Sequence, residues 1–339
     1  MKIAVLCGGL SNERDVSISS GTGIARALRA LGHPTVLIDL FLGCASADDG
    51  LFTTDERDSA FFVKENVPDL ASVRAMRPGQ GLIGPNVLEV CRAADIVFLA
   101  LHGEEGENGK IQALFDLYGI RYTGSGYLGS AVAMNKSLTK TILTQAGIPV
   151  PKGLLLHRGQ EPFADPGFPC VVKPCSGGSS VGTTIAFDPE EYASALELAF
   201  RYEDSVIAEG YIEGRELTVG VIDGKAMPVI ELIPKNGFYD YKNKYQAGLT
   251  VELCPAPITE AETESVQRLA ERVYATLGLE AYGRADFIMD RDGVIYCLEA
   301  NTLPGMTPTS LIPQMGAAMG MDYGALCQKL IDVSLKKYV

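Results

Sequence analysis

The chain has 339 residues, with 42 acidic and 29 basic side chains and a net charge of −13. This charge argues against a nucleic-acid-binding surface, which would need clustered Lys and Arg. Apolar residues make up 47% of the chain, but no run reaches the roughly 20 residues that cross a membrane. Met1 leads directly into a strand, so no signal peptide is expected. The scattered cysteines include no CxxC pair and indicate a reducing cytoplasm without disulfides.

This length predicts two or three domains. The first begins with KIAVLCGG (2–9), a buried strand of the parallel type that runs into a glycine turn and a helix from about Val16 to Leu31. That is the opening of a doubly wound α/β domain, in which ligands bind at the carboxyl ends of the strands. The turn lacks G-x-G-x-x-G, which disfavours an NAD-dependent oxidoreductase. Glu13 lies in this turn, either facing a ligand or stabilising the start of the helix.

Further buried strands are predicted at 33–40 and 93–103. The second ends in the loop HGEEGENG, so His102 is expected in the same crevice as Glu13. A lone histidine there is either a structural residue or a ligand-facing one, and the pattern leaves both open. Residues 41–85 are polar and are interpreted as an excursion from the domain.

The middle of the chain contains a second informative stretch, FPCVVKPCSGGSSVGTTIAF (168–187), which predicts a strand, a loop and a strand. Lys173 is at the end of the first strand. The Ser/Gly loop at 176–180 offers backbone amides and hydroxyls to a phosphate, although a flexible hairpin loop has the same composition. It is not a Walker A loop. Further along, the Tyr- and Lys-rich segment 236–248 is interpreted as a long loop that acts as a lid.

The C-terminal stretch 283–306 has the pattern of a β-hairpin. Two runs rich in β-branched and aromatic residues flank Asp292-Gly293, which favours a two-residue type I′ turn. Counting outward from that turn sets Ile288 opposite Cys297.

The same count sets Asp286 opposite Glu299, with Asn301 on the same face. Two opposed carboxylates repel each other, and a hard cation between them would remove that cost. Two carboxylates and an amide oxygen suit Mg²⁺, whereas the alternative is a hairpin whose acids face solvent. Arg284 beside them suits an anionic ligand, and Gly305 in the following turn lets the backbone approach that ligand closely.

Taken together, these motifs resemble the D-alanine–D-alanine ligases of the ATP-grasp superfamily. The motifs, in the order of that family, are GGLSNERDVSISSG (8–21), ALHGEEGENG (100–109), YTGSG (122–126), VVKPCSGGSSVG (171–182), FYDYKNKY (238–245) and GRADF with LEANTLPGMTPTSL (283–311). The resemblance implies an α/β (α+β) ATP-grasp fold. The implied domains are an N-terminal doubly wound domain at 1–132, a central subdomain at 133–213 and a C-terminal subdomain at 214–339.

The resemblance also implies a reaction. ATP and two D-alanines give D-alanyl-D-alanine, ADP and phosphate through a D-alanyl phosphate, for peptidoglycan synthesis. Relatives that join D-alanine to D-serine or D-lactate are the alternative, and Tyr245 in its YDYKNKY setting favours the dipeptide-forming type. ATP and Mg²⁺ are the expected cofactors, with two ions and with Mn²⁺ as a substitute. A cytoplasmic homodimer is expected, without nucleic-acid or membrane partners.

Roles for individual residues follow from the resemblance. The expected metal ligands are Asp286, Glu299 and Asn301. The expected nucleotide contacts are Lys136, Lys173, Ser179, Ser180, Glu209, Gly210, Tyr211, Ile212, Glu216 and Lys244. The expected D-alanine contacts are Glu13, His102, Arg284, Gly305, Ser310 and Leu311. Arg284 and the Gly305 N–H would stabilise the tetrahedral oxyanion, and Glu13, Ser179 and Tyr245 would form a hydrogen-bonded link over the substrates. Asn108 departs from the family, where an acidic residue is usual.

Overall fold

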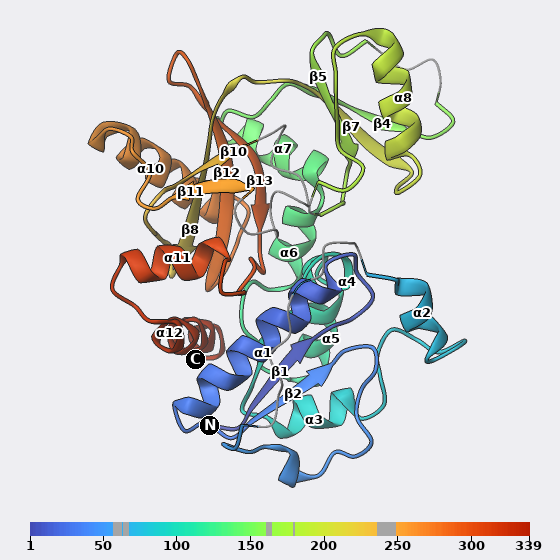
Figure 1. Ribbon diagram of the computed structural model, residues 1–339, viewed down its shortest axis with the longest axis vertical. Coiled ribbons are helices and arrows are strands. Elements are labelled where there is room, and N and C mark those ends of the chain that lie inside the picture. The colour runs from blue at the N-terminus through green and yellow to red at the C-terminus, as the bar shows by residue number, and fades with distance from the viewer. Residues whose placement is uncertain (57–62, 64–67, 161–164, 179, 236–248) are drawn as a thin grey trace.

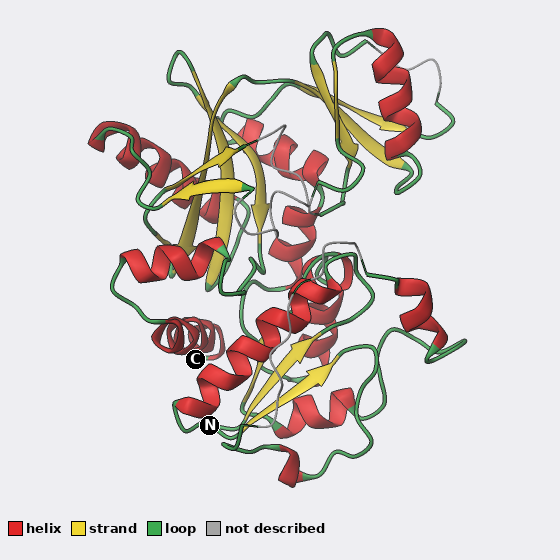
Figure 2. Ribbon diagram, in the orientation of Figure 1, coloured by secondary structure: helices red, strands yellow, loops and turns green. Residues whose placement is uncertain are grey.

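The computed structural model describes residues 1–339 except for 57–62, 64–67, 161–164, 179 and 236–248, and it contains three β-sheets with helices packed around them (Figure 1). The mixed helix and sheet class predicted from the sequence is confirmed (Figure 2). Within the described ranges, no helix has both the length and the apolar content needed to cross a bilayer.

The N-terminal sheet is parallel, in the order β2-β1-β3. Its central strand β1 (Ile3–Cys7) is buried along its whole length, because helices cover both faces. Gly8 follows at a φ of +75°, where a Cβ would lie 2.1 Å from Asp39 Oδ2, so the turn needs glycine. The other elements of this part are α1 (Arg14–Ala30), β2 (Thr35–Asp39), η1 (Asp49–Leu51), α2 (Leu70–Ala75), α3 (Val87–Ala93), β3 (Ile96–Leu99), α4 (Glu104–Glu107), α5 (Lys110–Tyr118) and α6 (Tyr127–Met134).

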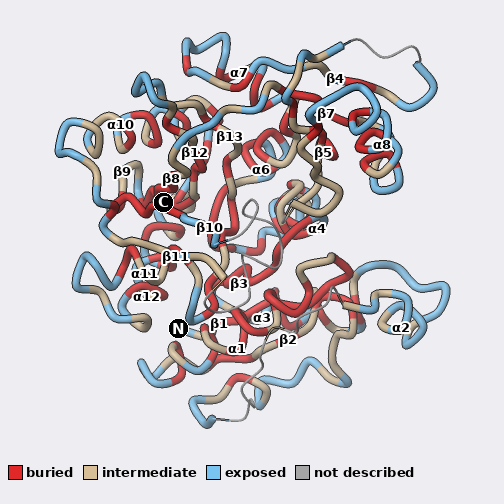
Figure 3. The backbone as a smooth tube through the Cα atoms, turned by 45° about the horizontal axis from the view of Figure 1, so that its top comes forward, coloured by how far each residue is buried: buried red, intermediate tan, exposed pale blue. Residues whose placement is uncertain are grey.

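The predicted excursion at 41–85 contributes only η1 and α2 as regular elements among its described residues. No residue of α2 is buried, and Figure 3 shows this helix as an exposed stretch at the edge of the molecule. The loop expected after β3 contains the short helix α4, which was not predicted from the sequence.

The central part is an antiparallel four-stranded sheet in the order β4-β7-β5-β6, covered by α8 (Pro189–Ala199). The side chain of Asp188 caps α8 by accepting the N–H groups of Glu190 and Glu191. The strands are β4 (Gly153–His157), β5 (Cys170–Pro174), β6 (Thr184–Ala186) and β7 (Ser205–Gly210). The helix that precedes them, α7 (Lys136–Gln145), packs against the C-terminal sheet.

The C-terminal part contains an antiparallel sheet in the order β11-β10-β8-β12-β13, with β9 paired to β8. Its long helix α10 (Glu260–Thr276) begins with a capping box between Thr259 and Glu262. The other elements are β8 (Gly214–Ile222), β9 (Lys225–Ala226), β10 (Ile230–Pro234), β11 (Thr250–Leu253), β12 (Tyr282–Asp290), β13 (Ile295–Asn301), α11 (Leu311–Ala318), α12 (Tyr323–Leu335) and η2 (Lys336–Tyr338). The last long helix, α12, packs against α1 and joins the hydrophobic core of the N-terminal part.

The β12–β13 hairpin corrects one sequence prediction and confirms another. Asp292 does not have the positive φ that a type I′ turn requires, and the loop between Asp290 and Val294 has three residues, with Gly293 at a φ of +79°. The first pairs are therefore shifted, and Ile288 faces Tyr296 instead of Cys297.

A bulge after Asp286 then shifts the register back by one residue. Asp286 consequently faces Glu299, and Arg284 faces Asn301. Asp286, Glu299 and Asn301 therefore share one face as predicted, and Arg284 lies on the same face. The two departures from a regular hairpin cancel where the functional residues lie.

Candidate active site

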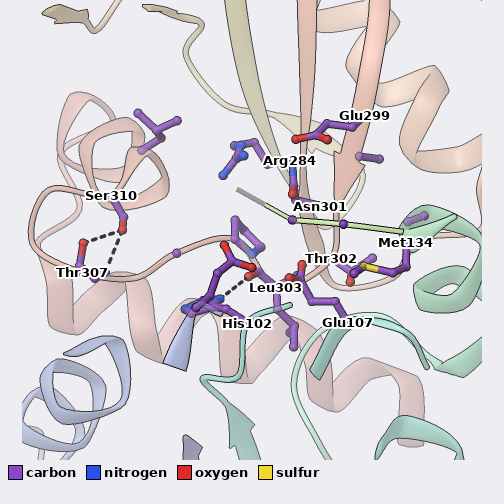
Figure 4. Close-up of a pocket in the computed structure, with 18 of the residues that line it drawn as sticks. His102, Glu107, Met134, Arg284, Glu299, Asn301, Thr302, Leu303, Thr307 and Ser310 are labelled. Carbon is purple, nitrogen blue, oxygen red and sulfur yellow. Dashed lines mark hydrogen bonds between the residues drawn. The ribbon is translucent and has the colours of Figure 1, made fainter. Parts of the chain in front are cut away.

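Two cavities lie between the three parts of the chain and share a wall. The first is enclosed by the loops that follow β1 and β3, the end of the β12–β13 hairpin and the start of α11 (Figure 4). The second lies between the four-stranded and the C-terminal sheets. Lys136, Gly177 and Glu299 line both cavities, so a ligand in one would meet a ligand in the other at these residues.

Every predicted site residue that the structure describes lines one or both of these cavities. The first is lined by Glu13, His102, Lys136, Arg284, Glu299, Asn301, Gly305, Ser310 and Leu311. The second is lined by Lys136, Lys173, Ser180, Glu209, Gly210, Tyr211, Ile212, Glu216, Asp286 and Glu299. Ser179, Lys244 and Tyr245 lie outside the described residues.

Glu13 precedes the first turn of α1, but its side chain makes no capping hydrogen bond to that helix. Its carboxylate lies against two loops instead, because a Cβ added to Gly103 or Gly178 would lie 2.9 or 2.7 Å from Glu13 Oε2. The second of these glycines belongs to the predicted phosphate loop. This position favours a ligand-facing carboxylate over a helix-capping one.

His102 is buried in the cavity wall, with both ring nitrogens engaged. Nδ1 lies 2.9 Å from the Leu303 carbonyl oxygen, and Nε2 lies 3.1 Å from Ser20 Oγ. Burial lowers the pKa of His102 and outweighs the nearby Glu13 carboxylate, which raises it. The ring is therefore neutral at neutral pH and is bound to protein groups on both sides.

One face of the β12–β13 hairpin carries the guanidinium of Arg284, the carboxylates of Asp286 and Glu299, and the amide of Asn301. Arg284 donates from Nε and Nη2 to the two oxygens of Asp286, each at 2.8 Å. Asp286 also accepts from Thr218 Oγ1 at 2.5 Å and from Asn301 Nδ2 at 3.0 Å. No three His, Cys, Asp or Glu side chains gather around one point in the described part of the chain, so a metal here would depend on two carboxylates and one amide.

Two lysines, Lys136 and Lys173, line the second cavity, and a third, Lys140, lies beneath it. Lys136, at the start of α7, donates to the Gly177 carbonyl and lies 3.5 Å from Glu299 Oε2. Lys173 donates to Glu209 Oε1 at 2.5 Å, and Lys140 lies 2.7 Å from Glu209 Oε2.

The Lys140–Glu209–Lys173 cluster, one carboxylate between two ammonium groups, is almost completely buried. Burial raises the pKa of Glu209, but the two lysines outweigh it and leave that pKa lowered. Burial lowers the pKa of Lys140, whereas the attraction of Glu209 leaves the pKa of Lys173 raised. The cluster thus holds an ionised carboxylate between two lysine nitrogens next to the cavity.

The remaining wall of the first cavity is formed by the turn after β13. Ser310 is the N-cap of α11 without a side-chain capping bond, and its Oγ instead accepts the Thr307 N–H at 2.9 Å. A Cβ on Gly305 would lie 2.8 Å from that same oxygen. The Gly305 backbone and the start of α11 therefore face the same small space.

Comparison with known proteins identifies the family. The model of the D-ala D-ala ligase N-terminus matches residues 2–125, and that of the D-ala D-ala ligase C-terminus matches residues 142–332. The chain belongs to the D-alanine–D-alanine ligase family. It is 43% identical to the D-alanine–D-alanine ligases of Pediococcus pentosaceus and Lacticaseibacillus casei over 100% of this chain, covering 99% and 97% of those relatives.

Solved structures of this family have the same fold. The D-alanine–D-alanine ligase of Bacillus anthracis superposes with a TM-score of 0.77 at 32% identity, covering 99% of this chain and 98% of that one. A second structure of that ligase, complexed with ATP, superposes with a TM-score of 0.76 at 29% identity and the same coverage. The ATP-grasp fold expected from the sequence motifs is confirmed.

Two charged residues, one lining the first cavity and one beneath the second, were not predicted. Glu107 lines the first cavity and accepts the N–H groups of Gly103 at 2.7 Å and Leu303 at 3.3 Å. Lys140 pairs with Glu209 beneath the second cavity. The acidic run of the HGEEGENG loop offered a signal for the first, but nothing distinguished its three glutamates. Lys140 follows Lys136 by one helical turn, and that spacing was a usable signal for the second.

Proposed function

We propose that this protein joins two D-alanines into D-alanyl-D-alanine at the expense of ATP, which supplies a dipeptide for peptidoglycan. The observation that carries the proposal is the wall shared by the two cavities. Residues expected to bind amino acids line one cavity, residues expected to bind nucleotide line the other, and Lys136, Gly177 and Glu299 belong to both. Transfer of a phosphoryl group from ATP to an amino-acid carboxylate requires the two ligands to be in contact at such a wall.

The reaction has two steps. A carboxylate oxygen of the first D-alanine attacks the γ-phosphorus, the bond from that phosphorus to the bridging oxygen breaks, and ADP leaves. The amine nitrogen of the second D-alanine then attacks the acyl carbon of the D-alanyl phosphate. The amine loses a proton, the bond from the acyl carbon to the phosphate oxygen breaks, and inorganic phosphate leaves.

The residues of the first cavity suit these steps. Glu13 offers a carboxylate to the ammonium group of the first D-alanine, and Arg284 with the Gly305 N–H offers donors to the oxyanion that develops on the acyl carbon. Ser310 and the first amides of α11, beginning at Leu311, offer donors to the carboxylate of the second D-alanine. His102 has no nitrogen left for the substrate and acts by holding the cavity wall.

The second cavity suits MgATP. Lys136, Lys173 and Ser180 would face phosphates, the backbone from Glu209 to Ile212 the adenine, and Glu216 the ribose. The proposed metal donors Asp286, Glu299 and Asn301 fit Mg²⁺ because they bring hard oxygens to one face of the hairpin. Two Mg²⁺ ions, or Mn²⁺ in their place, would neutralise charge on the transferred phosphate. With a metal ion bound to Asp286, Arg284 would keep at most part of its hydrogen bonding to that carboxylate.

The wider organisation is part of the proposal. The chain divides at about residues 132 and 213 into an N-terminal α/β domain and two subdomains that grip ATP. Ser179, Lys244 and Tyr245 would complete the site from segments outside the described residues. The protein would act as a homodimer in the cytoplasm, where its substrates ATP and D-alanine are available.

The test is ADP release by the purified protein with MgATP and D-alanine, alone and with D-serine or D-lactate added, with the product identified by mass. We expect D-alanyl-D-alanine as the dominant product and little ADP without amino acid. A mixed product in the competition would overturn the proposed specificity. Absence of D-alanine-dependent ADP release would overturn the ligase function.

A further inference from the structure

Residues 303–306 form a turn between β13 and α11, and side chains from other parts of the sequence bind its backbone at both ends. Its first residue, Leu303, donates its N–H to Glu107 Oε1 at 3.3 Å, and its carbonyl oxygen lies 2.9 Å from His102 Nδ1. Its last residue, Met306, donates its N–H to Ser20 Oγ at 3.2 Å. We call this four-residue segment, 303–306, the oxyanion turn.

The fourth contact comes from the C-terminal helix. Tyr323, the first residue of α12, donates its hydroxyl hydrogen to the Met306 carbonyl oxygen at 2.6 Å. Both backbone polar groups of Leu303 and both of Met306 are therefore bound to side chains. Those side chains come from α1, the loop around α4, and α12, which are otherwise separate elements.

The direction of each hydrogen bond follows from the partner atoms and from the neutral state of the His102 ring. A carbonyl oxygen only accepts, so His102 must carry a proton on Nδ1 to bind Leu303, and because burial keeps the ring neutral, its Nε2 then accepts. Ser20 therefore donates its hydroxyl hydrogen to His102 Nε2 while its oxygen accepts the Met306 N–H. The result is a single chain of hydrogen bonds that reaches the turn at both ends.

Gly305 is the residue left open by this arrangement. Leu303, Pro304 and Met306 are buried, whereas Gly305 is partly exposed and lines the first cavity. Its N–H has no acceptor among the described residues. The side chains thus fix the residues on either side of an amide that is kept available.

We propose that Ser20 and Tyr323 are positioning residues that, together with neutral His102, hold the oxyanion turn so that the Gly305 N–H meets the tetrahedral intermediate. This inference rests on the proposed function, because it needs an oxyanion in the first cavity. An oxyanion donor works only within about 2.7–3.1 Å of the developing charge. A displacement of about 1 Å can cost about 100-fold in rate, so anchoring at both ends matters.

The competing explanation is that these hydrogen bonds only satisfy buried polar groups. It predicts a loss of stability without a specific loss in one chemical step. The oxyanion forms only when the amine attacks the acyl phosphate, so a displaced turn should slow that second step and spare phosphoryl transfer. Unused D-alanyl phosphate would then react with water, and ADP would form in excess of dipeptide.

The experiment compares Ser20→Ala and Tyr323→Phe with two matched controls. Ser17→Ala removes another buried hydroxyl of α1, one that bridges Gly8 N and the Ala100 carbonyl. Tyr122→Phe removes another tyrosine hydroxyl, one that donates to Asp116. The readouts are kcat for dipeptide, KM for ATP, the ratio of ADP to dipeptide, and the thermal midpoint.

We expect both test variants to lose about 10- to 100-fold in kcat for dipeptide, with KM for ATP little changed and ADP in excess of dipeptide. The controls should keep ADP and dipeptide matched. Test variants that keep the two products matched, or controls that uncouple them equally, would overturn the positioning role alone. A wild-type protein that forms no dipeptide would overturn the proposed function, and this inference with it.

Discussion

Arg284 and Asp286 lie two residues apart on β12 and form a bidentate ion pair, with both N–O distances at 2.8 Å. The guanidinium is proposed to bind the oxyanion, and the carboxylate is a proposed metal ligand. The pair therefore links the two cavities through one strand. Binding of a metal ion would compete with Arg284 for Asp286 and leave the guanidinium freer to meet a substrate.

Arg284→Ala should lower kcat for dipeptide by about 100-fold or more, because it removes an oxyanion donor from a largely buried site. The matched control is Arg215→Ala, which breaks another bidentate pair of the same sheet, with Glu231 at 2.6 and 2.7 Å, outside both cavities. Steady-state kinetics and thermal midpoints of the two variants should separate the effects. Comparable kcat losses would contradict the assignment of Arg284.

Glu299→Gln should raise the Mg²⁺ concentration needed for half-maximal activity by about 10-fold or more, because a neutral amide binds a hard cation less well than a carboxylate. It also removes the negative partner of Lys136 at 3.5 Å. Titration of activity with Mg²⁺ at fixed ATP would measure the change. An unchanged Mg²⁺ dependence would argue that Glu299 is not a metal ligand.

The sequence predicted the functional face of the β12–β13 hairpin but not its path. Asp286 faces Glu299 as expected, although both the loop length and the strand register between them differ from the prediction. A three-residue loop and a bulge each shift the pairing by one residue, and the shifts cancel. Neither is visible in residue pattern alone, because an Asp-Gly pair also fits a two-residue loop and a bulge changes only the pairing between the strands.

Residues that bind ligands through local motifs were predictable, whereas those that act through tertiary contacts were not. The motif around Gly305 was recognised from consecutive residues. Ser20 and Tyr323, which hold the turn containing Gly305, are 286 and 17 positions from Met306 in sequence. Only the packing of α1 and α12 brings them together, and no periodicity along the chain encodes that meeting.

Glu107 should make folding stability depend on pH. Desolvation, reinforced by the nearby Glu13 carboxylate, raises the pKa of Glu107 from 4.5 to about 7. The folded state therefore binds more protons than the unfolded state between these values, and this group's contribution to stability falls as pH rises through that window. Thermal midpoints from pH 4.5 to about 8 should show wild type losing stability relative to Glu107→Gln. Parallel curves would contradict the raised pKa.

Lys140 should control ATP affinity through Glu209, although it lines neither cavity. Glu209 holds Lys140 at 2.7 Å and Lys173 at 2.5 Å, so loss of Lys140 leaves Glu209 with Lys173 alone. An ATP phosphate could then engage Lys173 only by leaving a buried carboxylate without compensation, which is costly. We expect Lys140→Met to raise KM for ATP by about 10-fold, with a smaller change in kcat.

A double-mutant cycle distinguishes this coupling from simple destabilisation. Glu209→Gln removes the carboxylate that competes with phosphate for Lys173, while keeping the backbone proposed to face adenine. Lys140→Met should therefore raise KM for ATP much less in the Glu209→Gln background than in the wild type. If KM for ATP rises equally in both backgrounds, Lys140 affects ATP binding independently of Glu209, and the proposed coupling through Glu209 is wrong.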